Sequence, residues 1–199
     1  MKKVLIIGAS GSLGQALTKQ LLNNDDYQLT LFSRSATQLN IDASNVKLVD
    51  GNASNPNDLD SVLQGQDAVF VALSGNLPKM ATTITNAMNK EHVSRIIFIS
   101  SMGIYNEIPE SVGASGNLAH NPFLQQYRDA ADIVEQSGLN YTIIRPGWFD
   151  NGSTNYEVTG RNEPFGGHDV SRAAIADLVT KLINDDHLYS KTSVGINRP

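Results

Sequence analysis

The chain has 199 residues, of which 40% are hydrophobic, so it is long enough for one domain with its own core. A formal net charge of −5 without a long basic run argues against nucleic acid and anionic membranes as partners. The absence of cysteine excludes disulfides and thiol catalysis, and the wide separation of the four histidines argues against a metal site. The apolar run before Gly8 is too short for a signal sequence, and no stretch approaches the roughly 18 apolar residues of a membrane span, which favours a cytoplasmic protein.

A glycine-rich turn follows an expected strand over residues 4–7 and leads into a helix with apolar residues at helical spacing. The turn reads Gly8-Ala9-Ser10-Gly11-Ser12-Leu13-Gly14. Glycine lets the backbone approach a bulky anion, and the helix N-terminus offers unpaired amides to a phosphate. We interpret it as the pyrophosphate site of a dinucleotide. The spacing is G-x-x-G-x-x-G rather than the commoner G-x-G-x-x-G, and the alternative is a tight turn without a ligand.

The second expected strand, residues 28–32, ends at Ser33-Arg34-Ser35. In a dinucleotide fold this strand end lies beside the adenosine ribose. A planar cation between two hydroxyls suits a phosphate, whereas a carboxylate there would bind a 2′-hydroxyl. The sequence therefore favours NADP over NAD, and the alternative is a solvated surface arginine.

The third expected strand, residues 46–49, is followed by Asp50-Gly51-Asn52. The carboxylate and the amide are placed to bind the adenine edge, or to form an Asx turn before the next segment. Asn55 and Pro56 then begin a helix that runs to residue 63, with proline at a tolerated first position.

Residues 67–73 form an apolar run typical of a central parallel strand buried on both faces. Its end is expected to lie beside the middle of the cofactor, with four residues in contact: Ala72, Leu73, Ser74 and Gly75. A helix over residues 78–91 leads to the fifth strand, residues 94–99, which ends at Ser100-Ser101 near the expected nicotinamide position. A serine there either polarises a substrate carbonyl or only caps the strand.

Two segments without clear periodicity, residues 104–120 and 150–167, are interpreted as walls of a substrate cleft. Between them, Asn121-Pro122 is expected to cap a helix that ends at residue 137, and a sixth strand covers residues 141–144. Pro146, Gly147 and Trp148 follow this strand; Trp148 is placed at the cleft edge, with the core as the alternative.

The last helix is expected to start at residues 168–171, capped by Asp169 or Ser171, and residues 192–196 are expected to form an edge strand. The alternation of strands and helices predicts a doubly wound parallel sheet with right-handed crossovers. Residues 1–199 thus form a single three-layer α/β/α domain in this interpretation.

The chain resembles the atypical short-chain dehydrogenases/reductases, and within them the small NAD(P)-binding proteins related to NmrA-like regulators and to flavin and biliverdin reductases. The resemblance covers nearly the whole chain and rests on Gly8–Gly14, Arg34, Ile99-Ser100-Ser101, residues 137–147 (SGLNYTIIRPG) and residues 171–183. It implies a Rossmann-type fold and an NAD(P) cofactor, and it does not specify a substrate.

One departure from this family affects the chemistry. Its reductases use a tyrosine and a lysine four residues later, and the tyrosine passes a proton to the substrate oxygen. Those two positions fall on Phe123 and Tyr127, and no Tyr-x-x-x-Lys occurs in the chain. Tyr127 is left to contact the nicotinamide ribose, and Ser101 and Tyr127 are the candidate catalytic residues.

Two functions fit this pattern. The first is an NADPH-dependent reductase of a small acceptor such as a flavin or a quinone, which collects its proton from water. The second is an NmrA-like sensor of the NADP(H) state that acts through a protein partner. A sugar-nucleotide or isoprenoid-type reductase is disfavoured because 199 residues leave little room for a substrate domain. The sequence leaves open whether the protein is a monomer or a homodimer.

Overall fold

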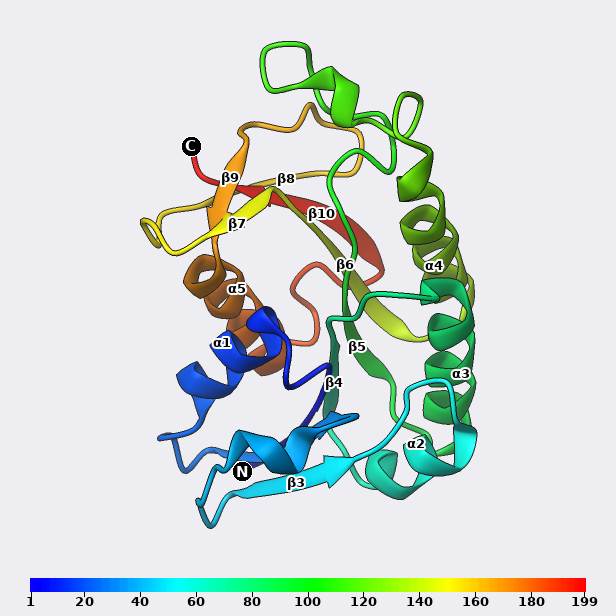
Figure 1. The fold of residues 1–199 in the computed structure, drawn as a ribbon, viewed down its shortest axis with the longest axis vertical. Coiled ribbons are helices and arrows are strands. Elements are labelled where there is room, and N and C mark those ends of the chain that lie inside the picture. The colour runs from blue at the N-terminus through cyan, green and yellow to red at the C-terminus, as the bar shows by residue number, and fades with distance from the viewer.

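A computed structural model describes residues 1–199 and contains one eight-stranded sheet (Figure 1). Its strand order is β3-β2-β1-β4-β5-β6-β10-β8, and every neighbouring pair is parallel except β10 and β8. The strands are β1 (Lys2–Ile7), β2 (Tyr27–Ser33), β3 (Val46–Asp50), β4 (Ala68–Val71), β5 (Arg95–Ile99), β6 (Asn140–Pro146), β8 (Glu157–Thr159) and β10 (Thr192–Asn197). The order reverses between β1 and β4, the position at which doubly wound sheets bind ligands.

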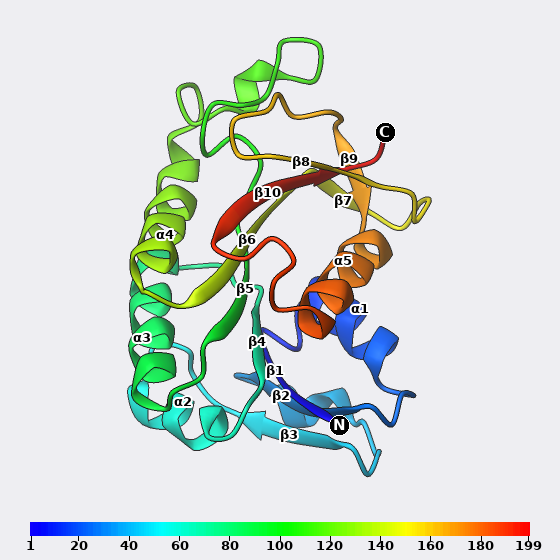
Figure 2. The same cartoon turned by 180° about the vertical axis from the view of Figure 1, so that it is seen from behind.

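Helices cover both faces of the sheet, as the opposite views in Figures 1 and 2 show. One face carries α1 (Ser12–Leu21) and α5 (Arg172–Asn184), which pack against each other. The other face carries α2 (Pro56–Leu63), α3 (Leu77–Lys90) and α4 (Gln125–Gln136). Along β1, Leu5 and Ile7 belong to the apolar core under the second group, and Val4 and Ile6 to the core under the first. The predicted α/β/α fold is therefore correct, since a strand buried on both faces reads as a continuous apolar run.

The helix starts follow local chemistry. The Asn55 side chain accepts a hydrogen bond from the Asn57 amide, with Pro56 at the first helical position. The Ser171 hydroxyl accepts a hydrogen bond from the Ala174 amide and caps α5. Of the two predicted caps, Asp169 and Ser171, Ser171 is therefore the correct one. The Asn121 side chain makes no capping hydrogen bond, so its predicted capping role is wrong. Short 3₁₀ turns form at Ala36–Leu39, Ala114–Gly116 and Pro122–Leu124.

The C-terminal third differs from the prediction in three ways. Residues 169–171 are not helical but form β9 (Asp169–Ser171), which pairs in parallel with β7 (Trp148–Asp150) as a separate small sheet. The segment 150–167, expected to lack strands, contains β8. Because β8 pairs antiparallel with β10, β10 is an inner strand rather than the expected edge, and the sheet is not wholly parallel.

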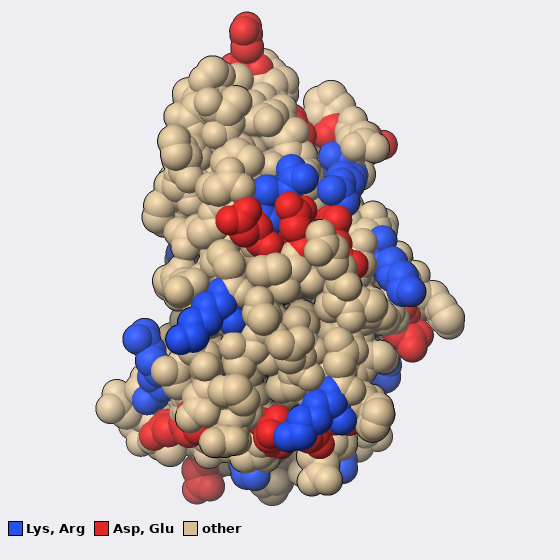
Figure 3. All heavy atoms as spheres, turned by 90° about the vertical axis from the view of Figure 1, so that its right-hand side faces the viewer, with Lys and Arg blue, Asp and Glu red and all other residues tan.

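The surface carries mixed charge. Figure 3 shows the face of α3 and α4, where acidic and basic side chains lie next to each other in small groups. Arg128 and Asp132 pair within α4, and Glu135 pairs with Arg161 from the segment after β8. No helix has the length and apolar character needed to cross a bilayer.

Candidate functional site

The glycine-rich turn brings three backbones together at the carboxyl end of β1. Gly8 has φ +93°, its amide donates to the Phe32 carbonyl, and a Cβ there would lie 2.0 Å from the Ala72 carbonyl oxygen. A Cβ on Gly14 would lie 2.4 Å from the Gly8 carbonyl oxygen. Glycine is therefore required by the fold itself at both positions.

Gly11 differs from the other two glycines of the turn. Its φ is −74°, and the only atom that an added Cβ would approach is the Gly8 carbonyl oxygen, at 3.2 Å. Gly11 is exposed and borders both cavities described below. Glycine at this position thus leaves open space where a ligand can approach the backbone, a fit to a pyrophosphate cradle.

The N-terminus of α1 is also free for an anion. Gly11 is the N-cap and supplies no side-chain cap, and the first turn contains no acidic residue. The amides of Ser12, Leu13 and Gly14 donate to no acceptor in the chain. Unpaired amides at the positive end of a helix dipole bind phosphate groups.

Two cavities meet at the glycine-rich turn. The polar cavity, of about 370 Å³, is lined by residues that follow β1, β2, β3 and β4: Ile7, Gly8, Ser10, Gly11, Phe32, Ser33, Arg34, Ser35, Gly51, Asn52, Ala53, Ser54, Ala72, Leu73, Ser74, Gly75, Asn76 and Met80. The apolar cavity, of about 500 Å³, is lined mainly by residues that follow β4, β5 and β6: Gly11, Ser12, Leu13, Ala72, Leu73, Ser74, Ile99, Ser100, Ser101, Met102, Gly116, Asn121, Phe123, Leu124, Tyr127, Pro146, Gly147, Trp148 and Phe149. Because both contain Gly11 and Ala72–Ser74, they form one cleft across the sheet reversal.

Nearly all the predicted site residues line this cleft. The two exceptions are Gly14, which packs α1 against the turn, and Asp50. The Asp50 carboxylate instead accepts hydrogen bonds from the Thr37 amide, at 2.8 Å, and from the Thr37 hydroxyl, at 2.7 Å. These bonds lower the pKa of Asp50, the hydroxyl bond most, so the structure gives this carboxylate another partner than adenine.

Arg34 lies exposed at the rim of the polar cavity. It makes no ion pair or hydrogen bond within the chain, so its guanidinium is available to a ligand. Asn52 lines the same cavity, but its Oδ1 accepts from the Ser54 amide at 2.9 Å, which is the Asx-turn alternative.

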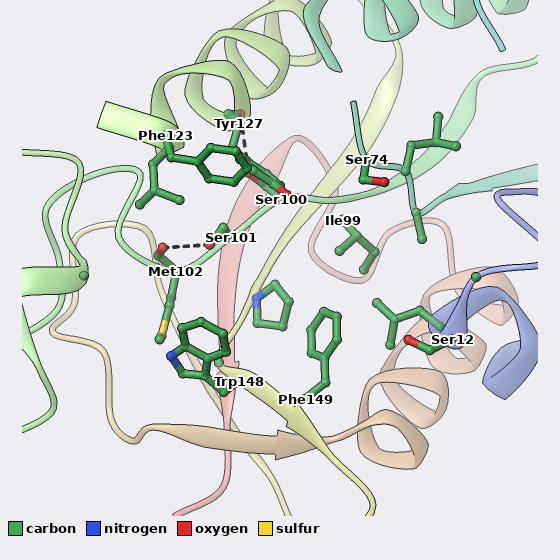
Figure 4. Close-up of a pocket in the computed structure, with 18 of the residues that line it drawn as sticks. Ser12, Ser74, Ile99, Ser100, Ser101, Met102, Phe123, Tyr127, Trp148 and Phe149 are labelled. Carbon is green, nitrogen blue, oxygen red and sulfur yellow. Dashed lines mark hydrogen bonds between the residues drawn. The ribbon is translucent and has the colours of Figure 1, made fainter. Parts of the chain in front are cut away.

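Aromatic side chains border the apolar cavity from two sides (Figure 4). Phe123 comes from the 3₁₀ turn before α4 and Tyr127 from the first turn of α4, with ring centroids 5.9 Å apart, and Trp148 and Phe149 face them from β7. Trp148 is 64% exposed, so its predicted place at the cleft edge is correct and the core alternative is wrong. Phe123 is 65% exposed, so its ring is available to a ligand.

The two serines after β5 lie at the back of this cavity. The Ser100 hydroxyl donates to the Tyr127 carbonyl at 3.4 Å, and the Ser101 hydroxyl donates to the Met102 carbonyl at 3.0 Å (Figure 4). In this arrangement Ser101 presents only its oxygen lone pairs to a ligand, and it donates to a substrate carbonyl once the hydroxyl rotates about the Cβ–Oγ bond and leaves the Met102 carbonyl.

The two long segments contribute less to the lining than expected. Residues 104–120 supply Gly116 alone, and residues 150–167 supply none. Phe149, Met102 and Asn121 complete the wall instead and were not among the predicted site residues. Phe149 directly follows Trp148, which was predicted to lie in the site. Its position just after the sixth strand was therefore the signal in the sequence that could have identified it.

A buried ion pair holds the first of these segments. The Arg145 and Glu107 side chains pair while only 0% and 5% exposed, and the Glu107 carboxylate accepts from the amides of Gly103 and Tyr105, each at 3.0 Å. The Tyr105 ring has three guanidinium groups around it, those of Arg128, Arg145 and Arg161, 4.3 to 5.1 Å from its centroid. Burial raises the pKa of Tyr105 to about 12. This network fixes the loop that carries Met102 into the cavity.

The comparison with protein families identifies the chain. The model of a family described as NAD(P)H-binding matches residues 8–186. The chain belongs to this NAD(P)H-binding family. The chain is also similar to a short-chain dehydrogenase/reductase from Veillonella parvula solved in complex with NADP, to which it is 28% identical. That similarity covers 100% of this chain and 95% of the other, with a TM-score of 0.91.

Two relatives of this NAD(P)H-binding protein are named for different activities. The uncharacterized sugar epimerase YhfK of Bacillus subtilis is 28% identical over 90% of this chain and 89% of its own. The oxidoreductase aflX of Aspergillus parasiticus is 26% identical over 99% of this chain and 84% of its own.

Proposed function

We propose that the protein is an NADPH-dependent reductase of a small acceptor with a planar ring, such as a flavin or a quinone. The observation that carries the proposal is the cleft itself. A polar cavity with a free arginine leads, past the cradle at Gly11, into an apolar cavity of about 500 Å³ between aromatic side chains. Flat rings stack on such side chains, whereas a sugar needs polar partners for its hydroxyls.

In this proposal, different groups of residues bind different parts of NADPH. The amides of Ser12, Leu13 and Gly14 bind the pyrophosphate, and the backbone of Ala72–Gly75 borders the middle of the cofactor. Arg34, with Ser33 and Ser35, binds the 2′-phosphate, and Gly51 and Asn52 border the adenosine. Ser100, Tyr127 and Pro146–Trp148 enclose the nicotinamide, which supplies a hydride when bound.

Proton supply is the step in which this chain departs from related reductases. Phe123 and Tyr127 stand where a catalytic tyrosine and its lysine are expected, so no phenol with a neighbouring ammonium lines the apolar cavity. A quinone or flavin that has received a hydride completes its reduction with a proton from water. Ser101 and Tyr127 are the side chains placed to contact the acceptor or the ribose.

Calorimetry with NADPH and NADH, followed by assays of NADPH oxidation with flavins and quinones, tests this proposal. We expect tighter binding of NADPH than of NADH, and oxidation only when an acceptor is present. Tight NADPH binding without turnover over a broad acceptor panel would instead support the alternative, an NmrA-like NADP(H) sensor with a protein partner. If neither nucleotide bound, both functions would be excluded.

A further inference from the structure

The side chains that line the apolar cavity are all uncharged. Its 19 lining residues include no Lys, Arg, Asp, Glu or His. The polar cavity, by contrast, has Arg34 at its rim. The free amides at the start of α1 lie where the two cavities meet, since Ser12 and Leu13 line the apolar cavity and Gly11 lines both, and the proposed function assigns these amides to the pyrophosphate. Once the pyrophosphate occupies them, the apolar half of the cleft contains no countercharge for an anion.

Charged groups near the apolar cavity are already paired. The Arg172 guanidinium lies 5.7 Å from the centroid of the Phe149 ring, and its Nη1 donates to the Asp150 carbonyl at 3.1 Å and to the Asn151 side chain at 3.2 Å. The Asp150 carboxylate accepts two hydrogen bonds from Arg198, at 2.6 and 2.7 Å. These guanidinium groups thus donate to acceptors outside the aromatic wall, and neither Arg172 nor Arg198 lines the cavity.

His168 lies behind the same wall. Its ring stacks on Trp148 with centroids 6.2 Å apart, and its Nδ1 lies 2.6 Å from the Asp169 carboxylate. Neither His168 nor Arg172 lines the cavity. An anionic group that entered the cavity would lose its water without gaining a cation, which is costly, whereas a neutral ring would gain contact on both faces.

We propose that the apolar cavity selects uncharged planar rings and rejects the same rings when they carry a phosphate, sulfonate or carboxylate. This inference rests on the proposed reductase function and narrows its acceptor to neutral quinones and flavins without a phosphate. The selectivity follows from the lining of the cavity and does not require that the bound ring be reduced.

Trp148 provides a direct test because it is the only tryptophan of the chain and lies at the cavity mouth. Quenching of its fluorescence in the protein saturated with 2′-phospho-ADP-ribose, which fills the phosphate half of the cleft but carries no nicotinamide and donates no hydride, measures ring binding without turnover. Two matched pairs differ mainly in charge: riboflavin and FMN, and 2-(hydroxymethyl)anthraquinone and anthraquinone-2-sulfonate. We expect the neutral member of each pair to bind at least about tenfold tighter, a difference of about 1.4 kcal/mol.

A variant pair separates charge from shape. Asn121 lines the cavity and makes no capping bond, so Asn121→Lys places a cation at the wall, and Asn121→Gln lengthens the side chain without charge. We expect Asn121→Lys alone to bring FMN close to riboflavin in affinity. Equal or tighter binding of the anionic members by the unaltered protein, or no binding of any ring, would overturn the inference. Selective ring binding without NADPH oxidation would support it and count against the reductase function instead.

Discussion

Single residues in the glycine-rich turn serve different purposes, and substitutions separate them. Gly14 is needed for packing, because a Cβ there would lie 2.4 Å from the Gly8 carbonyl oxygen and 2.8 Å from Ala9 Cα. Gly11 has an ordinary φ and an almost open Cβ position on the cleft. The same change at these two positions should therefore affect stability in one case and ligand binding in the other.

We expect Gly11→Val to abolish binding of NADPH while the protein still folds. Loss of a favourable N-cap residue costs about 1 kcal/mol, or about 2–4 °C in melting temperature for a chain of this size. Gly14→Val is the matched control and should prevent folding or lower the melting temperature far more. Calorimetry and thermal unfolding measure both effects, and unchanged NADPH affinity in Gly11→Val would show that the cradle lies elsewhere.

Arg34 is the residue on which the choice between NADPH and NADH depends. We expect Arg34→Ala to weaken NADPH binding by about 1.5–3 kcal/mol, the value of hydrogen bonds to a charged group, and to leave NADH binding almost unchanged. Arg34→Lys keeps the charge but loses the planar guanidinium, so its affinity for NADPH should lie between those of the unaltered protein and Arg34→Ala. Comparison of the two dissociation constants in each variant checks this, and equal losses for both nucleotides would refute the 2′-phosphate assignment.

At the scale of elements, the loop after β5 depends on the buried pair of Arg145 and Glu107. Both side chains are almost fully enclosed, so removal of one leaves the other as an unpaired buried charge. We expect Glu107→Ala to lower the free energy of unfolding by about 3–5 kcal/mol. Glu110→Ala, in the same loop but exposed and without an ion pair, should change it by less than about 0.5 kcal/mol. Chemical denaturation measures both, and similar values would contradict a supporting role for the pair.

The elements that sequence predicts well are those whose pattern is local. The six strands from β1 to β6 and the five helices form where the sequence predicts them, except that α4 and α5 begin a few residues later than expected, because periodicity and capping chemistry reflect burial directly. β8 and β9 have three residues each and exist only through partners distant in the chain, β10 and β7. No pattern within three residues specifies such pairing.

Prediction of the site from the sequence is limited in the same way. The residues after each strand were predictable, because parallel strands place their carboxyl ends together. The partner of Asp50 was not, since Thr37 lies in a 3₁₀ turn between two strands and nothing local directs it there. The exposure of Phe123 likewise follows from the 3₁₀ turn that precedes α4 and moves this residue off the buried helix face.

For the whole molecule, Tyr105 sets an alkaline limit of stability. Its pKa is raised from 10.0 to about 12, chiefly by burial, so the folded protein keeps this proton at a pH where the unfolded chain loses it. The stabilisation is complete below pH 10 and is lost as the pH rises from 10 to about 12. We expect the free energy of unfolding to fall over this range, and to fall less steeply in Tyr105→Phe. Denaturation at several pH values measures this; Tyr189→Phe, at a more exposed site, is the control and should keep the steeper slope.

The position of β10 affects the order in which the molecule can be assembled. Residues 192–197 lie between β6 and β8, which are separated from each other by 10 residues of sequence but do not pair directly. During synthesis from the N-terminus, β6 therefore has an open edge, and β8 has no partner, until these last residues emerge. Pairing between strands so distant in the chain is slow, because a long loop must close before any contact forms. A ribosome-bound chain that ends before residue 192 would expose the unpaired edge of β6, the feature of a nascent protein that chaperones protect from association with other chains.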